Sequence, residues 1–205
     1  MSAGALLRVI LFLVVLTLIS KPLGVYAYKV MEGVPTWAGR VLGPLERFFY
    51  RCCRVDPSAE MSWQAYFTGL LIFNAVGAAF LYLLLRIQAI LPLNPSHWGP
   101  VSPDSAFNTA ISFATNTSWQ DYAGETTLGN LAQMAGIASQ SFLSAATGIA
   151  ALMALLRGFA RIGANTLGNV WVDLTRGTVY VLLPLSALTA VLLISQGTKI
   201  GRAHV

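Results

Sequence analysis

The chain has 205 residues, of which 56% are hydrophobic and only 10% are charged, and its mean hydropathy is +0.65. A soluble domain carries about 25% charged residues, so the composition excludes an ordinary soluble protein and indicates a membrane protein. The net charge of +5 does not point to nucleic acid, because the basic residues lie in loops beside apolar segments, where they orient a protein in membrane lipid. With only the adjacent Cys52 and Cys53, a disulfide scaffold and a four-ligand zinc site are also excluded.

The first apolar segment, residues 2–20, is interrupted only by Arg8 and ends at Lys21-Pro22. Its length suits a first transmembrane helix. A secretory signal peptide is the alternative, because a basic residue precedes a short apolar core and Val25-Tyr26-Ala27 offers a small-residue cleavage site.

The loop that follows completes the first predicted region, residues 1–62, and it carries six basic residues. Pro35, Thr36 and Trp37 break its pattern, and a short interfacial helix is expected only at residues 45–50. The aromatic side chains around it suit the headgroup level of a membrane.

A second region, residues 63–156, reads as two spans with a polar connection between them. The spans are predicted at residues 63–91 and 129–156, each longer than the roughly 20 residues that cross a bilayer. Small residues are frequent in the second of them, which suits close helix packing. Asn74, inside the first, is either a packing residue or an ion ligand.

Residues 110–127 read AISFATNTSWQDYAGETT and contain no Lys or Arg. A short helix at about residues 106–114 is expected ahead of the polar centre, with Ser105 or Asp104 as its N-cap. Thr115 should end it, because hydroxyl and carboxamide side chains compete for backbone hydrogen bonds. A short helix and a polar extended segment between two spans are typical of a re-entrant pore loop, whose carbonyls and hydroxyls can replace the water shell of a cation.

Charge is distributed unevenly along the chain. Between Ile87 and Leu128 the only charged residues are Asp104, Asp121 and Glu125, which would either attract cations to a vestibule or cap helices. The loops on the other side carry six and three basic residues. By the positive-inside rule these loops are cytoplasmic, so the N-terminus and the filter loop face outward.

The third region, residues 157–198, holds a second basic loop and a fourth span at residues 177–196, which Pro184 should kink. A short helix is expected to begin at Val170. The last residues, 199–205, do not fit this pattern, and we interpret them as a non-native tail on an N-terminal fragment.

The segment TNTSWQDYAGETT, residues 115–127, resembles the potassium-binding A chain of the bacterial Kdp potassium-transporting ATPase. Ser118 is one departure, because the family pattern has Asn there. Other motifs match in the same order along the chain: KPLG at 21–24, LPLNP at 91–95, QSFLSAA at 140–146, NTLGN at 165–169 and WVDL at 171–174.

The resemblance implies an all-α membrane protein with four transmembrane helices and one re-entrant pore helix and filter loop, the first repeat of a potassium-channel-like fold. It implies a non-catalytic subunit in the bacterial inner membrane that binds outside K⁺ and passes it through an intramembrane tunnel. The partners implied are the P-type ATPase subunit and small accessory subunits of the Kdp complex, with no ATP bound by this chain. The filter residues implied are Thr115, Asn116, Thr117, Ser118 and Gln120, with K⁺ held by the first four.

Three alternatives remain at this point. The chain could be another potassium transporter of the same superfamily, a membrane-embedded enzyme that uses Asp104, Asp121 or Glu125, or a signal-anchored adaptor. Against the enzyme, the sequence places no His–carboxylate cluster or Ser–His pair near those carboxylates. Against the adaptor, such a protein needs no polar filter.

Overall fold

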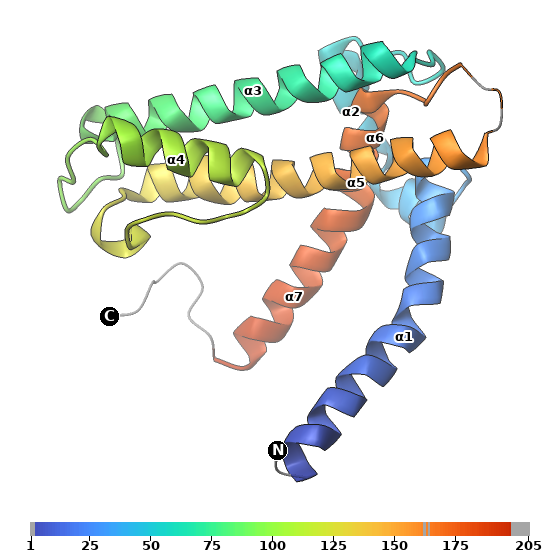
Figure 1. Ribbon diagram of the computed structural model, residues 1–205, viewed down its shortest axis with the longest axis horizontal. Helices are drawn as coiled ribbons and strands as arrows, with labels where there is room; N and C mark the ends of the chain where they lie inside the picture. The colour runs from blue at the N-terminus through green and yellow to red at the C-terminus, as the bar shows by residue number, and fades with distance from the viewer. Residues whose placement is uncertain (1–2, 162, 164, 198–205) are drawn as a thin grey trace.

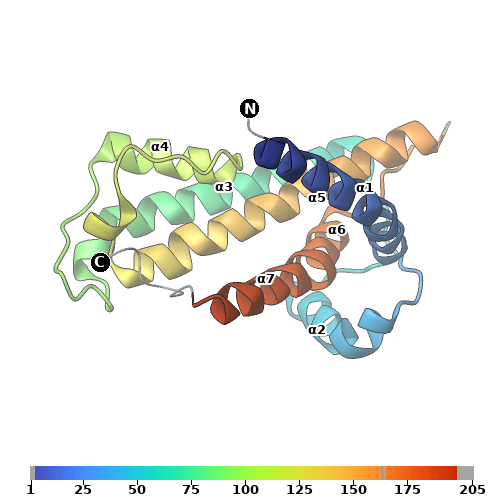
Figure 2. The same cartoon turned by 90° about the horizontal axis from the view of Figure 1, so that it is seen from below.

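The computed structural model describes residues 3–161, 163 and 165–197, and these residues are helical throughout apart from loops. Four of the described helical segments are long and apolar enough to cross a membrane: Gly4–Met31, Trp63–Ile90, Ala132–Ala160 and Val170–Ser195. Figure 1 and Figure 2 both show α3, α4 and α5 side by side in one bundle, and Figure 1 shows α1 and α7 leaving it at an angle. The prediction of four apolar helices long enough to cross a membrane is therefore confirmed. The predicted tail at residues 199–205 lies outside the described residues.

The first helix, α1 (Ala3–Met31), runs through Lys21-Pro22 instead of ending there as predicted. Proline removes a single backbone hydrogen bond, and the segment beyond it is held by packing. Val30 and Met31 are buried at its end, and the Tyr26 hydroxyl donates to the carbonyl of Tyr180, 2.9 Å away. The side chains before Lys21 are almost all exposed in this chain.

The second helix, α2 (Trp37–Cys53), is much longer than the short helix predicted for residues 45–50. Thr36, which we expected to break the chain, instead caps the helix by accepting a hydrogen bond from the Gly39 N–H at 3.3 Å. Pro44 lies inside the helix without ending it. Charged and aromatic residues are mixed along this amphipathic helix, and we therefore interpreted most of it as a loop.

Three elements meet at one end of the bundle, which we call the outer end after the orientation predicted from the charges: α3 (Trp63–Ile87), α4 (Pro103–Ala114) and the π-helical start of α5 at Ala132–Ala138. The core between them is apolar: Leu81, Leu85, Val101, Ala106, Ala110, Phe113, Leu128 and Ala132. Close approach depends on glycine, because a Cβ on Gly136 would lie 2.8 Å from the Leu84 side chain. The predicted role of small residues in packing is thus confirmed here.

The regular part of α5 (Ser139–Ala160) packs against α6 (Val170–Arg176), which begins at the predicted residue with Asn169 as its N-cap. The chain continues through the π-helical segment Gly177–Leu182 into α7 (Leu183–Ser195). Pro184 has no N–H for the Tyr180 carbonyl, four residues earlier. That carbonyl is the one that accepts from Tyr26 of α1, so the irregularity predicted from Pro184 serves to dock α1.

Ion pairs join the ends of the helices where α1, α5 and α6 meet. Arg157, 7% exposed, bonds both carboxylate oxygens of Asp173 at 2.5 and 3.0 Å and also Glu32 at 2.9 Å. The hydroxyl of Tyr66 in α3 donates to Asp173 at 2.8 Å. We call these four residues the inner ionic cluster.

A second ionic contact lies beside the inner ionic cluster. Arg176 pairs with Glu46 of α2 at 2.9 Å. Burial alone would raise the pKa of Glu46, but hydrogen bonds from Tyr180, Tyr50 and Arg176 hold it below its ordinary value. The α2 helix is therefore fastened to the membrane bundle by a charged carboxylate.

Candidate ion-binding site

The helix ahead of the predicted filter begins three residues earlier than expected. Ser102, not Ser105 or Asp104, is its N-cap and accepts from the Ser105 N–H at 3.4 Å, and Pro103 occupies the first helical position. Proline favours that position because its fixed φ suits a helix start. Asp104 then lies in the first turn, where its charge complements the helix dipole.

The other end of α4 matches the prediction, since the helix ends at Ala114 and Thr115 is its C-cap. The polar loop, residues 115–120, follows directly. Figure 1 shows the chain then returning to the end of the bundle at which α4 began. The C-terminus of α4, where the helix dipole is negative, thus borders the polar loop.

One residue, Ser112, anchors the backbone of the polar loop. Its carbonyl accepts from the N–H groups of Thr117 at 2.9 Å and Ser118 at 3.2 Å. Its hydroxyl accepts from the Trp119 N–H at 2.7 Å. Three successive N–H groups are therefore turned toward α4 and cannot face an ion.

The backbone of the loop alternates in conformation. Asn116 has φ +61° and Ser118 has φ +55°, whereas Thr115 and Thr117 have negative φ. Positive φ is tolerated by Asn better than by most residues. The sign of φ therefore alternates from residue to residue through the loop, which is not the backbone of an extended strand.

The side chains of the predicted filter residues are close together and exposed. The hydroxyls of Thr115 and Thr117 are 3.3 Å apart, and all of residues 115–118 are exposed in this chain. Asn116 is tied to α5, because the hydroxyl of the buried Ser144 donates to its side-chain oxygen at 3.2 Å. The loop is thus fixed on two sides, by Ser112 and by Ser144, and open on a third.

Gln120 lies apart from this group. No hydrogen bond among the described residues joins it to residues 115–118, and its amide nitrogen packs toward Gly124, where an added Cβ would lie 3.4 Å away. Its side-chain oxygen is buried and, within the described residues, has no hydrogen-bond partner. An unpartnered buried oxygen is costly, so a donor or cation from outside this part of the chain would stabilise it.

The outer loops are built on a residue that the sequence analysis missed. Gln88, 1% exposed, donates to the carbonyls of Gly99 at 2.5 Å and Thr127 at 2.9 Å and accepts from the Gly129 N–H at 3.2 Å. It joins the segment before α4 to the segment before α5. A carboxamide at the end of an apolar span was the available signal, because buried polar residues in spans are costly and usually bonded.

The other residues proposed from the sequence as possible site residues form no side-chain hydrogen bond with the polar loop 115–120 in the part of the chain that the structure describes. Asp121 accepts from the Ser105 hydroxyl at 2.7 Å, and Glu125 starts the exposed turn Gly124–Thr126. Asn74 bonds the carbonyl of Leu70 in its own helix at 2.8 Å. Within the described residues, no group of three or more His, Cys, Asp or Glu side chains could hold a metal ion.

Known proteins resemble this chain along most of its length. Residues 10–201 match the family model of the potassium-transporting ATPase A subunit, KdpA. The potassium-transporting ATPase potassium-binding subunit of Rhodospirillum centenum is 55% identical over 197 residues, which is 96% of this chain and 34% of that protein. The subunits of the same name from Ralstonia pickettii and Methylococcus capsulatus are 55% and 54% identical, with 94% and 96% of this chain and 32% and 33% of those proteins covered.

Proposed function

The chain belongs to the potassium-transporting ATPase A subunit family, and we propose that it forms part of a potassium-binding, channel-like subunit of a high-affinity ATP-driven uptake complex. It spans about a third of the length of the curated relatives that it matches. The activity of the whole protein, its substrate and its partners are therefore part of this proposal. The family match favours this function over another potassium transporter of the same superfamily.

The observation that carries the proposal is the open, neutral face of the polar loop. Residues 115–118 offer hydroxyl, carboxamide and backbone oxygens, and their N–H groups donate to carbonyls of α4, those of Thr117 and Ser118 to Ser112. Oxygen dipoles can replace the hydration shell of a cation without holding it too tightly to leave. The nearby C-terminus of α4 adds a partial negative charge.

The open side of the loop means that this chain alone does not complete a potassium site. A potassium site needs oxygens on all sides, and one polar loop supplies a fraction of them. We propose that α3, α4, the polar loop and α5 form one pore repeat, with α4 as the re-entrant pore helix. Further repeats of the whole subunit would supply the remaining oxygens and cover the largely exposed residues 4–20 of α1 and the exposed face of α7.

Energy for transport must come from a partner. The sequence contains no phosphate-binding GxxxxGK[ST] motif and no DKTG phosphorylation motif. We propose that K⁺ enters from the outside, passes the polar loop and is delivered through an intramembrane tunnel to a P-type ATPase subunit. In this orientation the polar loop faces outward, and the inner ionic cluster and α2 lie at the cytoplasmic surface of the bacterial inner membrane.

The proposal is tested by transport in a reconstituted system. The full-length subunit should be assembled with its ATPase and accessory subunits in proteoliposomes, and ATP-driven K⁺ movement measured. We expect transport only when ATP is on the side of α2 and K⁺ is on the side of the polar loop. Transport from the opposite side would overturn the orientation, and the absence of any K⁺ movement by an active complex would overturn the function.

A further inference from the structure

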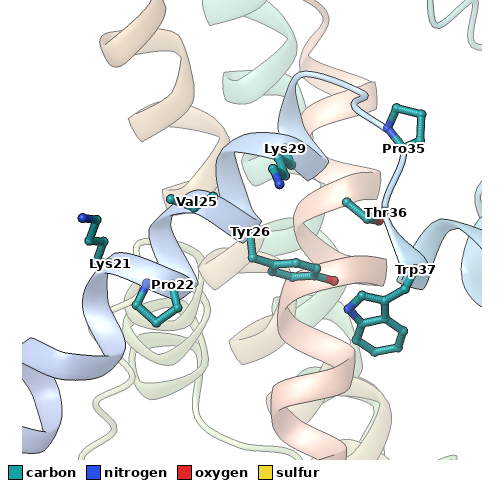
Figure 3. A pocket seen from close by; sticks show the side chains of 8 residues that line it. All are labelled: Lys21, Pro22, Val25, Tyr26, Lys29, Pro35, Thr36 and Trp37. Atoms are coloured by element: carbon teal, nitrogen blue, oxygen red, sulfur yellow. The ribbon is translucent and has the colours of Figure 1, made fainter.

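A groove lies where the end of α1 meets the start of α2, on the face opposite the inner ionic cluster. Its volume is about 620 Å³, and it is lined by Lys21, Val25, Tyr26, Lys29, Thr36 and Trp37 among others. Figure 3 shows the Tyr26 ring reaching from α1 toward the start of α2, with Lys21 before it and Lys29 after it along α1. None of the ion transport described above uses these residues.

The charge of this groove is positive and unbalanced. No Asp or Glu lines it, and within the described residues neither lysine takes part in an ion pair. The nearest acidic residue along α1, Glu32, is already paired with Arg157 and Arg161. An adjoining hollow past Trp37 adds Arg40, so the site offers cations without counter-ions.

The apolar run of α1 ends at the groove. Residues 3–20 contain a single charged residue, Arg8, and Lys21 and Lys29 follow about 12 Å apart along the helix. Lysines at the end of an apolar span extend their ammonium groups to the headgroup level of the membrane. We therefore expect headgroups beside the two lysines.

The walls of the groove are also suited to a lipid. Tyr26 is fixed by its bond to the Tyr180 carbonyl, and Trp37 is 73% exposed beside it. Tyr and Trp are enriched at this level of the membrane because their rings accept both apolar and polar neighbours. A protein segment is disfavoured here, because lysine is depleted from the buried part of protein interfaces and would lack a partner.

We propose that this groove binds one anionic phospholipid of the cytoplasmic leaflet, with its phosphate between Lys21 and Lys29 and its upper acyl chain against Val25 and Tyr26. The inference rests on the orientation given under the proposed function but not on ion transport. Each lysine near an anionic surface contributes about 1 kcal/mol. The bound lipid would fasten the long α1 to the amphipathic α2.

The test measures lipid binding to the purified complex that contains the full-length subunit. Native mass spectrometry in detergent should compare phosphatidylglycerol with phosphatidylcholine for the tightest site. We expect the double variant Lys21→Gln/Lys29→Gln to bind phosphatidylglycerol about thirty-fold more weakly and phosphatidylcholine equally well. Lys29→Gln alone should weaken phosphatidylglycerol about five-fold, which keeps the test valid if the double variant does not assemble.

Two matched controls separate this site from general attraction. Lys21→Arg/Lys29→Arg keeps both charges and should retain the preference for phosphatidylglycerol. Arg51→Gln/Arg54→Gln removes two exposed charges from the same side of the chain but outside the groove, and it should change nothing. An equal loss in this control, an unchanged preference in the double Gln variant or no preference in the parent protein would overturn the proposal.

Discussion

The two ends of the bundle are held together by different chemistry. At the inner end Arg157, Asp173, Glu32 and Arg161 form ion pairs, and Arg176 pairs with Glu46. At the outer end, in the part of the chain that the structure describes, the side-chain hydrogen bonds of residues 112–119 all join neutral hydroxyl, carboxamide and backbone groups. The inner end is held by charged pairs, whereas the polar loop is held by neutral dipoles that leave one face open.

This difference has a physical reason. A fixed positive charge beside the path of a cation repels it, and a site that binds the cation too tightly does not release it. Neutral oxygens avoid both effects but must be held in place by other bonds, which Ser112, Ser144 and Gln88 supply. Changes at the inner end should therefore act on stability, and changes at the outer end on the response to potassium.

The largest effect is expected at the inner ionic cluster. Arg157→Met in the full-length subunit leaves the carboxylate of Asp173, 1% exposed, buried without its partner. Breaking a buried pair in this way costs about 3–5 kcal/mol, and thermal unfolding of the purified subunit should show that loss. The paired variant Arg157→Met/Asp173→Leu should recover most of the lost stability. If it recovers no stability, the unpaired Asp173 carboxylate is not the cause of the loss.

The next effect is expected at Gln120, where we predict a change in potassium response without loss of assembly. Gln120→Arg puts a positive charge near the entering ion, and like charges about 5 Å apart at an effective dielectric near 20 repel by about 3 kcal/mol. The potassium concentration for half-maximal ATPase activity should rise about a hundredfold, within a range of one to three orders of magnitude.

The control is Gln120→Glu, which should weaken the potassium response much less. If both variants fail equally and the complex does not assemble, the role of Gln120 is structural. An unchanged half-saturation concentration in Gln120→Arg would remove this residue from the ion path.

A smaller effect is expected from Gln88→Leu. The substitution leaves two carbonyls and one N–H of the outer loops without their partner. Leaving a buried polar group unpaired costs about 1–3 kcal/mol of stability. Hydrogen exchange of the Gly129 N–H, which donates to the Gln88 side chain, should become faster, while exchange around Arg157 stays the same. The matched control is Gln64→Leu, at an exposed position of the same helix, which should leave exchange unchanged; equal effects would contradict the role given to Gln88.

The smallest effect is expected from Ser144→Ala, which removes the bond from α5 to Asn116. A hydrogen bond of this kind contributes about 0.5–1.5 kcal/mol. Apparent potassium affinity should fall by about two- to tenfold, with little change in the unfolding temperature. Ser141→Ala removes a hydroxyl that bonds only its own helix at Ile137 and should leave affinity unaltered; a drop as large as for Ser144→Ala would show that the contact with Asn116 is not the cause.

The spans and the end of α4 could be predicted because they follow from local rules of length, apolarity and helix propensity. The start of α4 was placed too late because Pro103 moved the cap back to Ser102, and α1 was ended too early because Pro22 was read as a stop. The polar loop was found by its composition. Its anchors were not. Ser144 and Gln88 act through contacts with distant parts of the chain, and Ser112 acts through the folded shape of the loop that follows it.

The claim that the polar loop belongs to a potassium site is tested most directly by ion-dependent stability. The full-length subunit should be melted in potassium and in sodium at the same ionic strength. A selective site predicts greater protection by potassium, about 2.7 kcal/mol at a hundredfold excess over the dissociation constant. Identical melting curves in the two salts would contradict the account.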